Sequence, residues 1–169
     1  MQHSFVTDVI ERLAGLARGS HIDSLRTARP DVVRALQESH RALFEPKDLG
    51  QLPRSEREAA ALRASVLIGH PVLAAFHRDR LARLGFSPDI VAAVEAGPGP
   101  GPLAPRTISV LAFVDHVTLT PARPADDARA RLFAASLDAG AVVALTGVIA
   151  FTALRARLLI GLDLLGDAP

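Results

Sequence analysis

The chain of 169 residues contains no cysteine, tryptophan or tyrosine, and aromatic residues make up only 4% of it. The absence of cysteine excludes disulfides, thiolate metal ligands and a thiolate nucleophile. The absence of tryptophan and tyrosine argues against a stacking platform for nucleic acid bases. Nineteen basic and 18 acidic residues give a formal net charge of +1. We therefore expect no nucleic acid partner, because such proteins carry a clustered basic surface.

Several signature motifs are missing as well. The N-terminal residues show no basic region followed by an apolar run, so we expect no signal peptide and a cytoplasmic protein. There is no P-loop, G-x-G-x-x-G or G-x-S-x-G sequence. The Pro–Gly run at 97–105 has prolines where a phosphate cradle needs backbone N–H donors. We expect no cofactor.

The residues that are present favour packed helices. Apolar residues make up 49% of the chain, and its many alanines, leucines and arginines favour helices over sheets. We predict an all-α fold of seven or eight helices in a single domain, 1–169. Its N-terminal helices would span 1–54, its core helices 55–97 and its C-terminal helices 98–169. The Pro–Gly run is interpreted as a surface loop within that domain. Helix starts are expected near Thr7 or Asp8, Ile22, Pro30, Ser55, Pro71, Pro88, Pro105 and Asp126. The first helix is expected to end at Gly19–Ser20, and the helix that starts at Asp126 at Asp138–Gly140.

The segment 55–85 is predicted to form two helices joined by a tight break. Ser55 and Glu58 have the spacing of a capping box, in which the glutamate side chain returns to the helix start. Gly69 can take a positive φ and end the first helix. Pro71 suits the first position of the second helix, with His70 before it.

The polar residues of these two helices are the candidates for a catalytic site. His70 and His77 lie at helical spacing on one face of the second helix, and Glu58 lies 19 residues before His77. A Glu–His pair can perform general acid–base catalysis, because imidazole titrates near neutral pH and a carboxylate fixes its tautomer. Each residue also has a structural interpretation. Glu58 could only cap its helix, His77 could be a core histidine with one hydrogen bond, and His70 could accept from a free N–H of the first turn.

This spacing resembles the alkylhydroperoxidase D-like (carboxymuconolactone decarboxylase-like) family. Its peroxidase branch has a Glu, then Cys-x-x-Cys-x-x-x-His, then a Gly. Glu58, His77 and Gly85 match the Glu, the His and the Gly, whereas the two cysteine positions fall on His70 and Leu73. Near the C-terminus, Phe151 and Arg157 match a looser family pattern.

The resemblance implies an alkylhydroperoxidase D-like helical bundle and directs attention to Glu58, His77 and His70 as catalytic candidates. Without thiols, peroxide reduction by the family's thiol mechanism is excluded. The favoured function is decarboxylase- or isomerase-like proton transfer on a small organic substrate. The alternative is a catalytically inactive oligomeric scaffold or small-ligand-binding protein.

Other polar residues give weaker signals. A metal site from Glu58, His70 and His77 is disfavoured, because seven residues along a helix span roughly 10 Å; we expect no metal. His21, His40 and His116 are interpreted as surface or packing residues. The charged face of the second helix is interpreted as solvated, with a subunit contact as the alternative. Its members are Arg78, Asp79, Arg80 and Arg83.

The run from Ala139 to Leu154 is almost wholly apolar. Its 16 residues fall short of the ~20 that a membrane helix needs, so we expect no membrane partner. A helix that is apolar all round must be buried on all sides. In a chain of this size that burial calls for a partner subunit, so we predict a homo-oligomer. The family resemblance implies a trimer or hexamer.

Overall fold

The computed structural model describes residues 8–166, and in this range the chain forms nine helices and no strands. The all-α prediction is confirmed. The helices are α1 (Val9–Ala14), α2 (His21–Thr27), α3 (Pro30–Phe44), α4 (Arg54–Ile68), α5 (Pro71–Arg83), α6 (Pro88–Ala96), α7 (Pro105–Leu119), α8 (Asp126–Ala134) and α9 (Ala139–Gly166).

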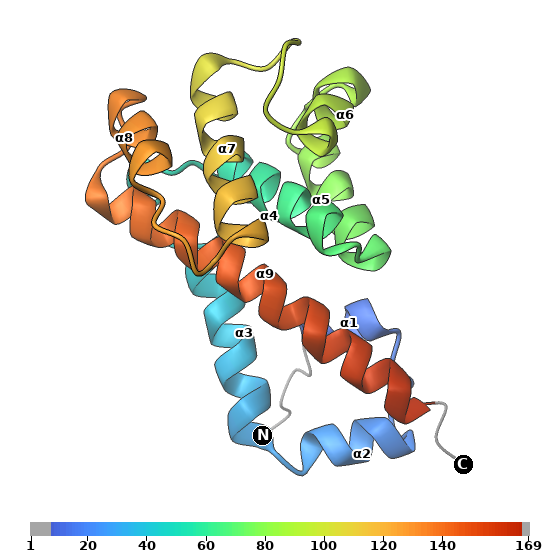
Figure 1. The fold of residues 1–169 in the computed structure, drawn as a ribbon. Coiled ribbons are helices and arrows are strands. Elements are labelled where there is room, and N and C mark those ends of the chain that lie inside the picture. The colour runs from blue at the N-terminus through green and yellow to red at the C-terminus, as the bar shows by residue number, and fades with distance from the viewer. Residues whose placement is uncertain (1–7, 167–169) are drawn as a thin grey trace.

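Helix α4 is the centre of the arrangement. It packs against α5, α7 and α9, and also contacts α6 and α3. Figure 1 shows α9 running across the molecule, with α4 to α8 on one side of it and α2 and α3 on the other. The long helix therefore joins the N-terminal helices to the rest of the chain.

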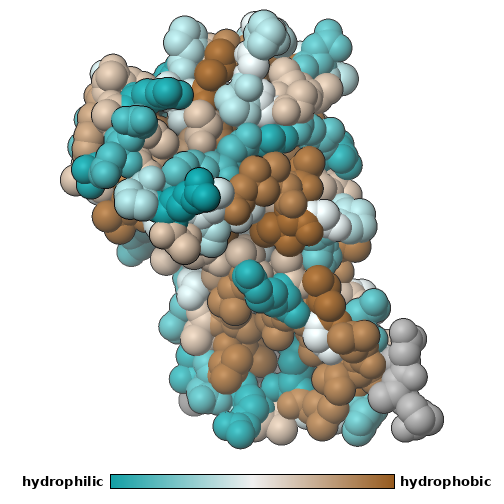
Figure 2. Space-filling model, viewed as in Figure 1, coloured by the Kyte–Doolittle hydropathy of each residue, from teal (hydrophilic) through white to brown (hydrophobic). Residues whose placement is uncertain are grey.

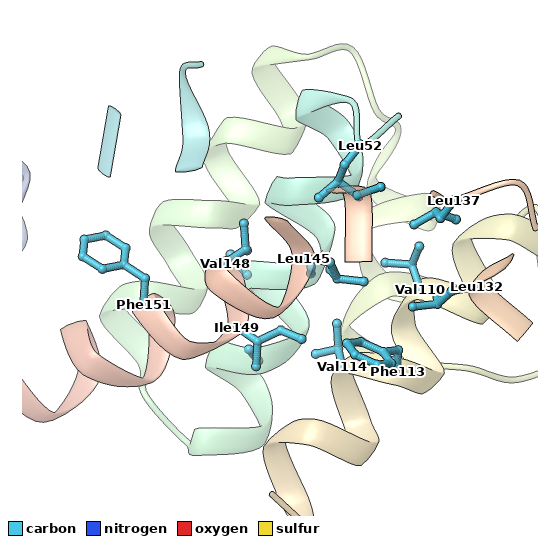
Figure 3. Packing of buried hydrophobic residues seen from close by; sticks show 14 of the residues in the cluster. Leu52, Val110, Phe113, Val114, Leu132, Leu137, Leu145, Val148, Ile149 and Phe151 are labelled. Atoms are coloured by element: carbon cyan, nitrogen blue, oxygen red, sulfur yellow. The ribbon is translucent and has the colours of Figure 1, made fainter. Parts of the chain in front are cut away.

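The main hydrophobic core lies between α4, α7, α8 and α9. Figure 3 shows Val110 and Val114 of α7 facing Leu145 and Ile149 of α9, with Leu132 of α8 alongside. A second cluster joins α4, α5, α6 and α7, and a third joins α1, α5 and α9. Leu103, in the Pro–Gly segment, is 9% exposed and belongs to the second cluster. This segment therefore folds back onto the core.

The predicted capping box at Ser55 and Glu58 is wrong. The N-cap of α4 is the extended Pro53, two residues before Ser55, and it makes no side-chain capping bond. Ser55 consequently lies inside the first turn. Glu58 is 2% exposed and bonds to residues of α5. The Glu58 carboxylate therefore bonds to a neighbouring helix and does not cap its own.

Two other boundaries differ from expectation. Helix α1 ends at Gly15 (φ 61°), four residues before the predicted Gly19–Ser20 stop, because Gly15 takes the left-handed conformation. The predicted stop at Asp138–Gly140 is instead a helix start, where the Asp138 side chain accepts from the Ala141 backbone N–H at 2.7 Å. Helix α9 then continues for 28 residues.

The expectation that this apolar helix is too short to span a membrane is wrong. Its 28 residues and a window with a mean hydropathy of 1.8 make it long and apolar enough to cross a membrane. In this fold, 44% of that window is buried by the chain itself, and core helices of soluble proteins meet the same criteria.

Part of α9 lies at the surface of the single chain. Figure 2 shows hydrophobic surface gathered along the course that α9 follows in Figure 1. The α9 residues with exposed apolar side chains are Val143, Leu154, Ile160, Leu164 and Leu165. The helix is therefore not covered on all sides by its own chain. We call these five residues the α9 apolar face.

Arg57 fixes the connection between α3 and α4. Its guanidinium donates to the backbone oxygens of Leu52 (2.8 Å), Leu43 (2.7 Å) and Leu49 (3.1 Å). Burial lowers the pKa of Arg57. These bonds satisfy carbonyls of the α3 end and the loop that follows, and they hold the start of α4 in place.

Candidate active site

The break between α4 and α5 places the two helices side by side. Gly69 adopts a left-handed conformation (φ 76°) that ends α4, and the next helix begins at Pro71. The His70 ring accepts from the backbone N–H of Leu73 at 3.3 Å and so caps α5. This is the structural role that the sequence allowed for His70.

Glu58 of α4 and His77 of α5 meet directly in the packed interior. The distance from His77 Nδ1 to Glu58 Oε2 is 2.6 Å. On the opposite side of the ring, Arg155 Nη2 of α9 lies 2.8 Å from His77 Nε2. Glu58 is 2% exposed, and His77 and Arg155 are both 0% exposed. Three helices thus build one buried chain of hydrogen bonds.

This chain assigns the protonation state of His77. A guanidinium donates hydrogen bonds and cannot accept them, so Nε2 must be the acceptor of the Arg155 contact. The ring proton therefore lies on Nδ1 and is donated to Glu58. His77 is a neutral imidazole whose basic nitrogen faces Arg155.

The electrostatic environment agrees with this assignment. Burial lowers the pKa of His77, the hydrogen bond to Glu58 opposes it and the charge of Arg155 adds to it, and together they leave the pKa at about 4. Burial alone would raise the pKa of Glu58, but the bonds from His77 and Arg80 outweigh it and hold the pKa low. Burial lowers the pKa of Arg155 to about 10. At neutral pH the site therefore contains a carboxylate, a neutral imidazole and a guanidinium.

Arg80 completes the site at its solvent-facing edge. Its Nε donates to Glu58 Oε1 at 2.5 Å, and a second nitrogen lies 3.6 Å from Glu45. The side chain is 26% exposed and its guanidinium lies 5.7 Å from the centre of the Phe76 ring. The prediction that Arg80 belongs to a solvated face is therefore wrong, since it neutralises the buried carboxylate.

Aromatic rings form the wall of the site. The His40 ring stacks on Phe44 with centroids 5.2 Å apart, and Phe44 stacks on His77 at 5.3 Å. The Arg155 guanidinium lies 5.0 Å from Phe44 and 5.1 Å from Phe151. His40 is therefore a packing residue, as predicted, but it packs at the site. Burial, with the charges of Arg155 and Arg80, lowers its pKa to about 3.

The structure brings together two of the three predicted site residues. Glu58 and His77 share a hydrogen bond, whereas His70 borders a separate hollow between α1, α5 and the end of α9. Three site residues were missed from sequence, namely Arg155, Arg80 and His40. Arg157, matched to the family's arginine, is exposed, and within residues 8–166 it bonds only to the Ala153 carbonyl of its own helix.

A signal for Arg155 did exist. It lies three residues after Thr152 and four before Leu159, and all three residues are buried on one side of α9. Arg157 falls on the other side. Helical periodicity applied to the arginines themselves would have selected Arg155.

The site has no metal-binding character. Across residues 8–166, no group of three histidines, aspartates or glutamates is arranged to hold a metal ion. The polar atoms around His77 are one carboxylate and two guanidinium groups, and guanidinium groups supply no ligand electron pair. The arrangement is suited to moving a proton and holding a negative charge.

Comparison with solved structures places the fold. An uncharacterized peroxidase-related protein from Silicibacter sp. TM1040 superposes with a TM-score of 0.72 at 18% identity, over 79% of this chain and 69% of that one. A protein of unknown function from Agrobacterium tumefaciens, considered a candidate AhpD antioxidant defence protein, superposes with a TM-score of 0.71 at 20% identity. The superposition covers 82% of this chain and 92% of that one. At such identities the likeness shows the fold alone.

Sequence comparison identifies the family. No curated protein sequence matches the chain. The family model described as "Carboxymuconolactone decarboxylase family" matches residues 30–116, which include Glu58 and His77 and end before α9. This match covers more than half of the chain, and so the protein belongs to the carboxymuconolactone decarboxylase family, as a member without cysteine.

Proposed function

We propose that this protein is a cysteine-independent acid–base enzyme that transfers protons on a small organic substrate, in a decarboxylase- or isomerase-like reaction. The observation that carries the proposal is the buried chain of hydrogen bonds from Glu58 through His77 to Arg155. Once the Arg155 contact is displaced, the neutral imidazole can accept a proton at Nε2, and the carboxylate behind it stabilises the imidazolium that results.

In this proposal His77 Nε2 is the base. Because Arg155 donates to that nitrogen, the substrate must take the place of the Arg155 contact. The guanidinium then donates to the oxygen on which negative charge develops when carbon loses a proton or carbon dioxide. In an isomerase-like reaction His77 Nε2 takes the proton from one carbon and returns it to another. In a decarboxylase-like reaction it takes the proton of the substrate's carboxylic acid group and returns it to the carbon that loses carbon dioxide. Glu58 accepts from Nδ1 and holds the ring in one tautomer throughout.

The test is a panel of small carboxylic acids and lactones assayed with the wild-type protein and His77→Ala. For the compound that turns over, we expect kcat/KM to fall by about 10²–10⁴ in the variant, the usual contribution of a general base. His21→Ala, at an exposed histidine outside the site, is the matched control and should keep wild-type activity. A turned-over compound whose rate is unchanged in His77→Ala would contradict the proposal.

Peroxide reduction is examined in the same assays, because one structural neighbour is described as peroxidase-related and the other as a candidate antioxidant defence protein. A chain without cysteine has no thiolate to attack peroxide. Peroxide consumption with an external dithiol should therefore stay at the rate without protein.

One observation favours the second candidate, an inactive scaffold or small-ligand-binding protein. His77 is fully buried in the single chain and its basic nitrogen is already bonded. If no member of the panel turns over and the His77 ring shows no chemical-shift change in NMR spectra with any compound, the scaffold function replaces the enzymatic one.

We also propose that copies of the chain associate through the α9 apolar face. Its five large apolar side chains are exposed, as expected for the core of a protein interface, and the exposed Arg157 lies among them. Light scattering should give a trimer or hexamer for the wild type and a smaller species for Leu154→Glu/Ile160→Glu. Leu25→Glu, at an exposed leucine of α2, should leave the assembly intact. A monomeric wild type that binds lipid vesicles would contradict this proposal.

A further inference from the structure

We propose that the protein has a second binding site, separate from the Glu58–His77 pair, for a small neutral and largely apolar molecule with one hydrogen-bonding group. The site is a pocket between α4, α5, α6 and α7, bordered by the Pro–Gly segment before α7. Neither Glu58 nor His77 lines it.

The size of the pocket limits what it can hold. Its volume is about 230 Å³. Typical sites for larger ligands begin at about 300 Å³. The occupant is therefore a compact molecule, such as a one- or two-ring compound.

The walls are mostly apolar and well buried. Ala59 of α4 is 5% exposed, Leu81 of α5 is 1% exposed and Val94 of α6 is 2% exposed. Leu103 of the Pro–Gly segment closes another side. Since a ligand with apolar surface releases water from these walls, the pocket favours apolar ligands over polar ones.

Two hydroxyl groups provide the polar part of the pocket. Ser55 of α4 and Thr107 of α7 are half-buried and line it. Neither side chain has a hydrogen-bond partner within residues 8–166. Each can donate one bond and accept others, so the pair suits one hydroxyl or carbonyl group on the ligand.

The pocket carries no free charge. Glu56 lines it, but its carboxylate receives two bonds from Arg106, at 2.6 and 3.0 Å. The same guanidinium donates to the backbone oxygens of Ala135 and Gln51. The paired charges stay satisfied when a ligand enters. An ionised ligand would lose hydration without gaining a counter-charge, so a neutral ligand is favoured.

This site also accounts for a sequence motif that the acid–base chemistry does not use. The Pro–Gly run from Gly97 to Pro105 cannot form a helix. Its glycines at 97 and 101 have φ values of 98° and 157°, which the other residues rarely adopt. The segment turns back to place Pro102, Leu103 and Ala104 against the pocket.

The test uses 2-naphthol as the probe, a neutral two-ring molecule with one hydroxyl. The protein has no tryptophan or tyrosine, so the fluorescence anisotropy of the probe can be followed without interfering protein emission. We expect saturable binding to the wild type. Thr107→Val should weaken 2-naphthol binding by about fivefold, the effect of one hydrogen bond, and leave naphthalene binding unchanged.

Three comparisons complete the experiment. Thr107→Phe, which fills the pocket, should reduce binding of both probes more than tenfold while unfolding at the wild-type temperature. Thr146→Val, on the exposed side of α9, is the control and should bind as the wild type does. The charged 2-naphthoate should bind at least tenfold more weakly than 2-naphthol.

The result that would overturn the site is wild-type affinity for both probes in a folded Thr107→Phe protein, or no saturable binding to the wild type. His77→Ala should retain full 2-naphthol binding, because His77 does not line the pocket. The second site and the acid–base function can therefore fail independently of each other.

Discussion

Lowering the pH from 7 to 5 is expected to reduce the free energy of unfolding by about 3–4 kcal/mol, through His40 and His77 together. Both rings are buried, and their pKa values are lowered from 6.5 to about 3 and about 4. In the unfolded chain each histidine takes up a proton below pH 6.5, whereas in the folded protein both stay neutral down to pH 4 or lower. The unfolded state thus binds more protons, and acid favours it.

Denaturant unfolding followed by circular dichroism at pH 7, 6 and 5 measures this dependence. His40→Gln and His77→Gln should each remove about half of the difference between pH 7 and pH 5, and the double variant most of it. Comparing each variant with itself at two pH values cancels any packing change that the substitution causes. An unchanged pH dependence in the double variant would show that these rings do not stay neutral in the folded protein.

Glu58 contributes in the same direction at lower pH. Its pKa is held below the ordinary value of 4.5 in the folded state. The stability that it provides is therefore present above pH 4.5 and is lost as the pH falls through the lower folded value. Acid unfolding should consequently steepen below pH 4.5, and Glu58→Gln should lose that part of the steepening.

The second large effect is expected for Glu58→Gln at neutral pH. The substitution keeps the shape of the side chain but removes the negative charge between Arg80 and His77. Arg155 and Arg80 then remain with no buried counter-charge in the site. Removing one partner of a buried ionic network typically costs about 3–5 kcal/mol, and the free energy of unfolding from denaturant titration measures this loss.

A double variant separates charge from packing. Glu58→Gln/Arg155→Met removes the carboxylate together with one of the cations, so its loss should be smaller than the sum of the two single losses by at least about 0.5 kcal/mol. Asp79→Ala breaks an exposed ion pair with Arg83 on α5 and is the control, with an expected change of at most about 0.5 kcal/mol. Additive losses would show that Glu58 and Arg155 do not interact.

The boundaries of α3, α5, α6 and α7 were predictable because they depend on single residues. Each begins with a proline at its first position, as the sequence predicted. Gly69 ends α4 in the left-handed conformation, also as predicted. Helix α9 was predicted too short, because the prediction followed only the apolar run, which ends at Leu154. The helix continues through Arg155 and Arg157 to Gly166, since arginine is compatible with a helix.

The candidate site was predictable only in part. Glu58 and His77 were found through their spacing and the family pattern, and their hydrogen bond agrees with that prediction. His70 caps α5 and does not join them. The catalytic roles of Glu58 and His77 stay predictions, as do the homo-oligomer, its trimeric or hexameric number and the cytoplasmic location.

The sequence by itself determined the helical class, the break at Gly69–Pro71 and the absence of thiol chemistry, because each of these depends on residues that are adjacent in the chain or missing from it. Only the tertiary structure decided where Glu58 turns and which arginine reaches His77. Glu58 has the spacing of a cap, yet it bonds to α5. Arg155 and Arg157 both follow the same apolar run, but only Arg155 lies on the buried side of α9. The physical reason is that the partner of a charged side chain is selected by which elements pack together, and this is a property of the whole chain.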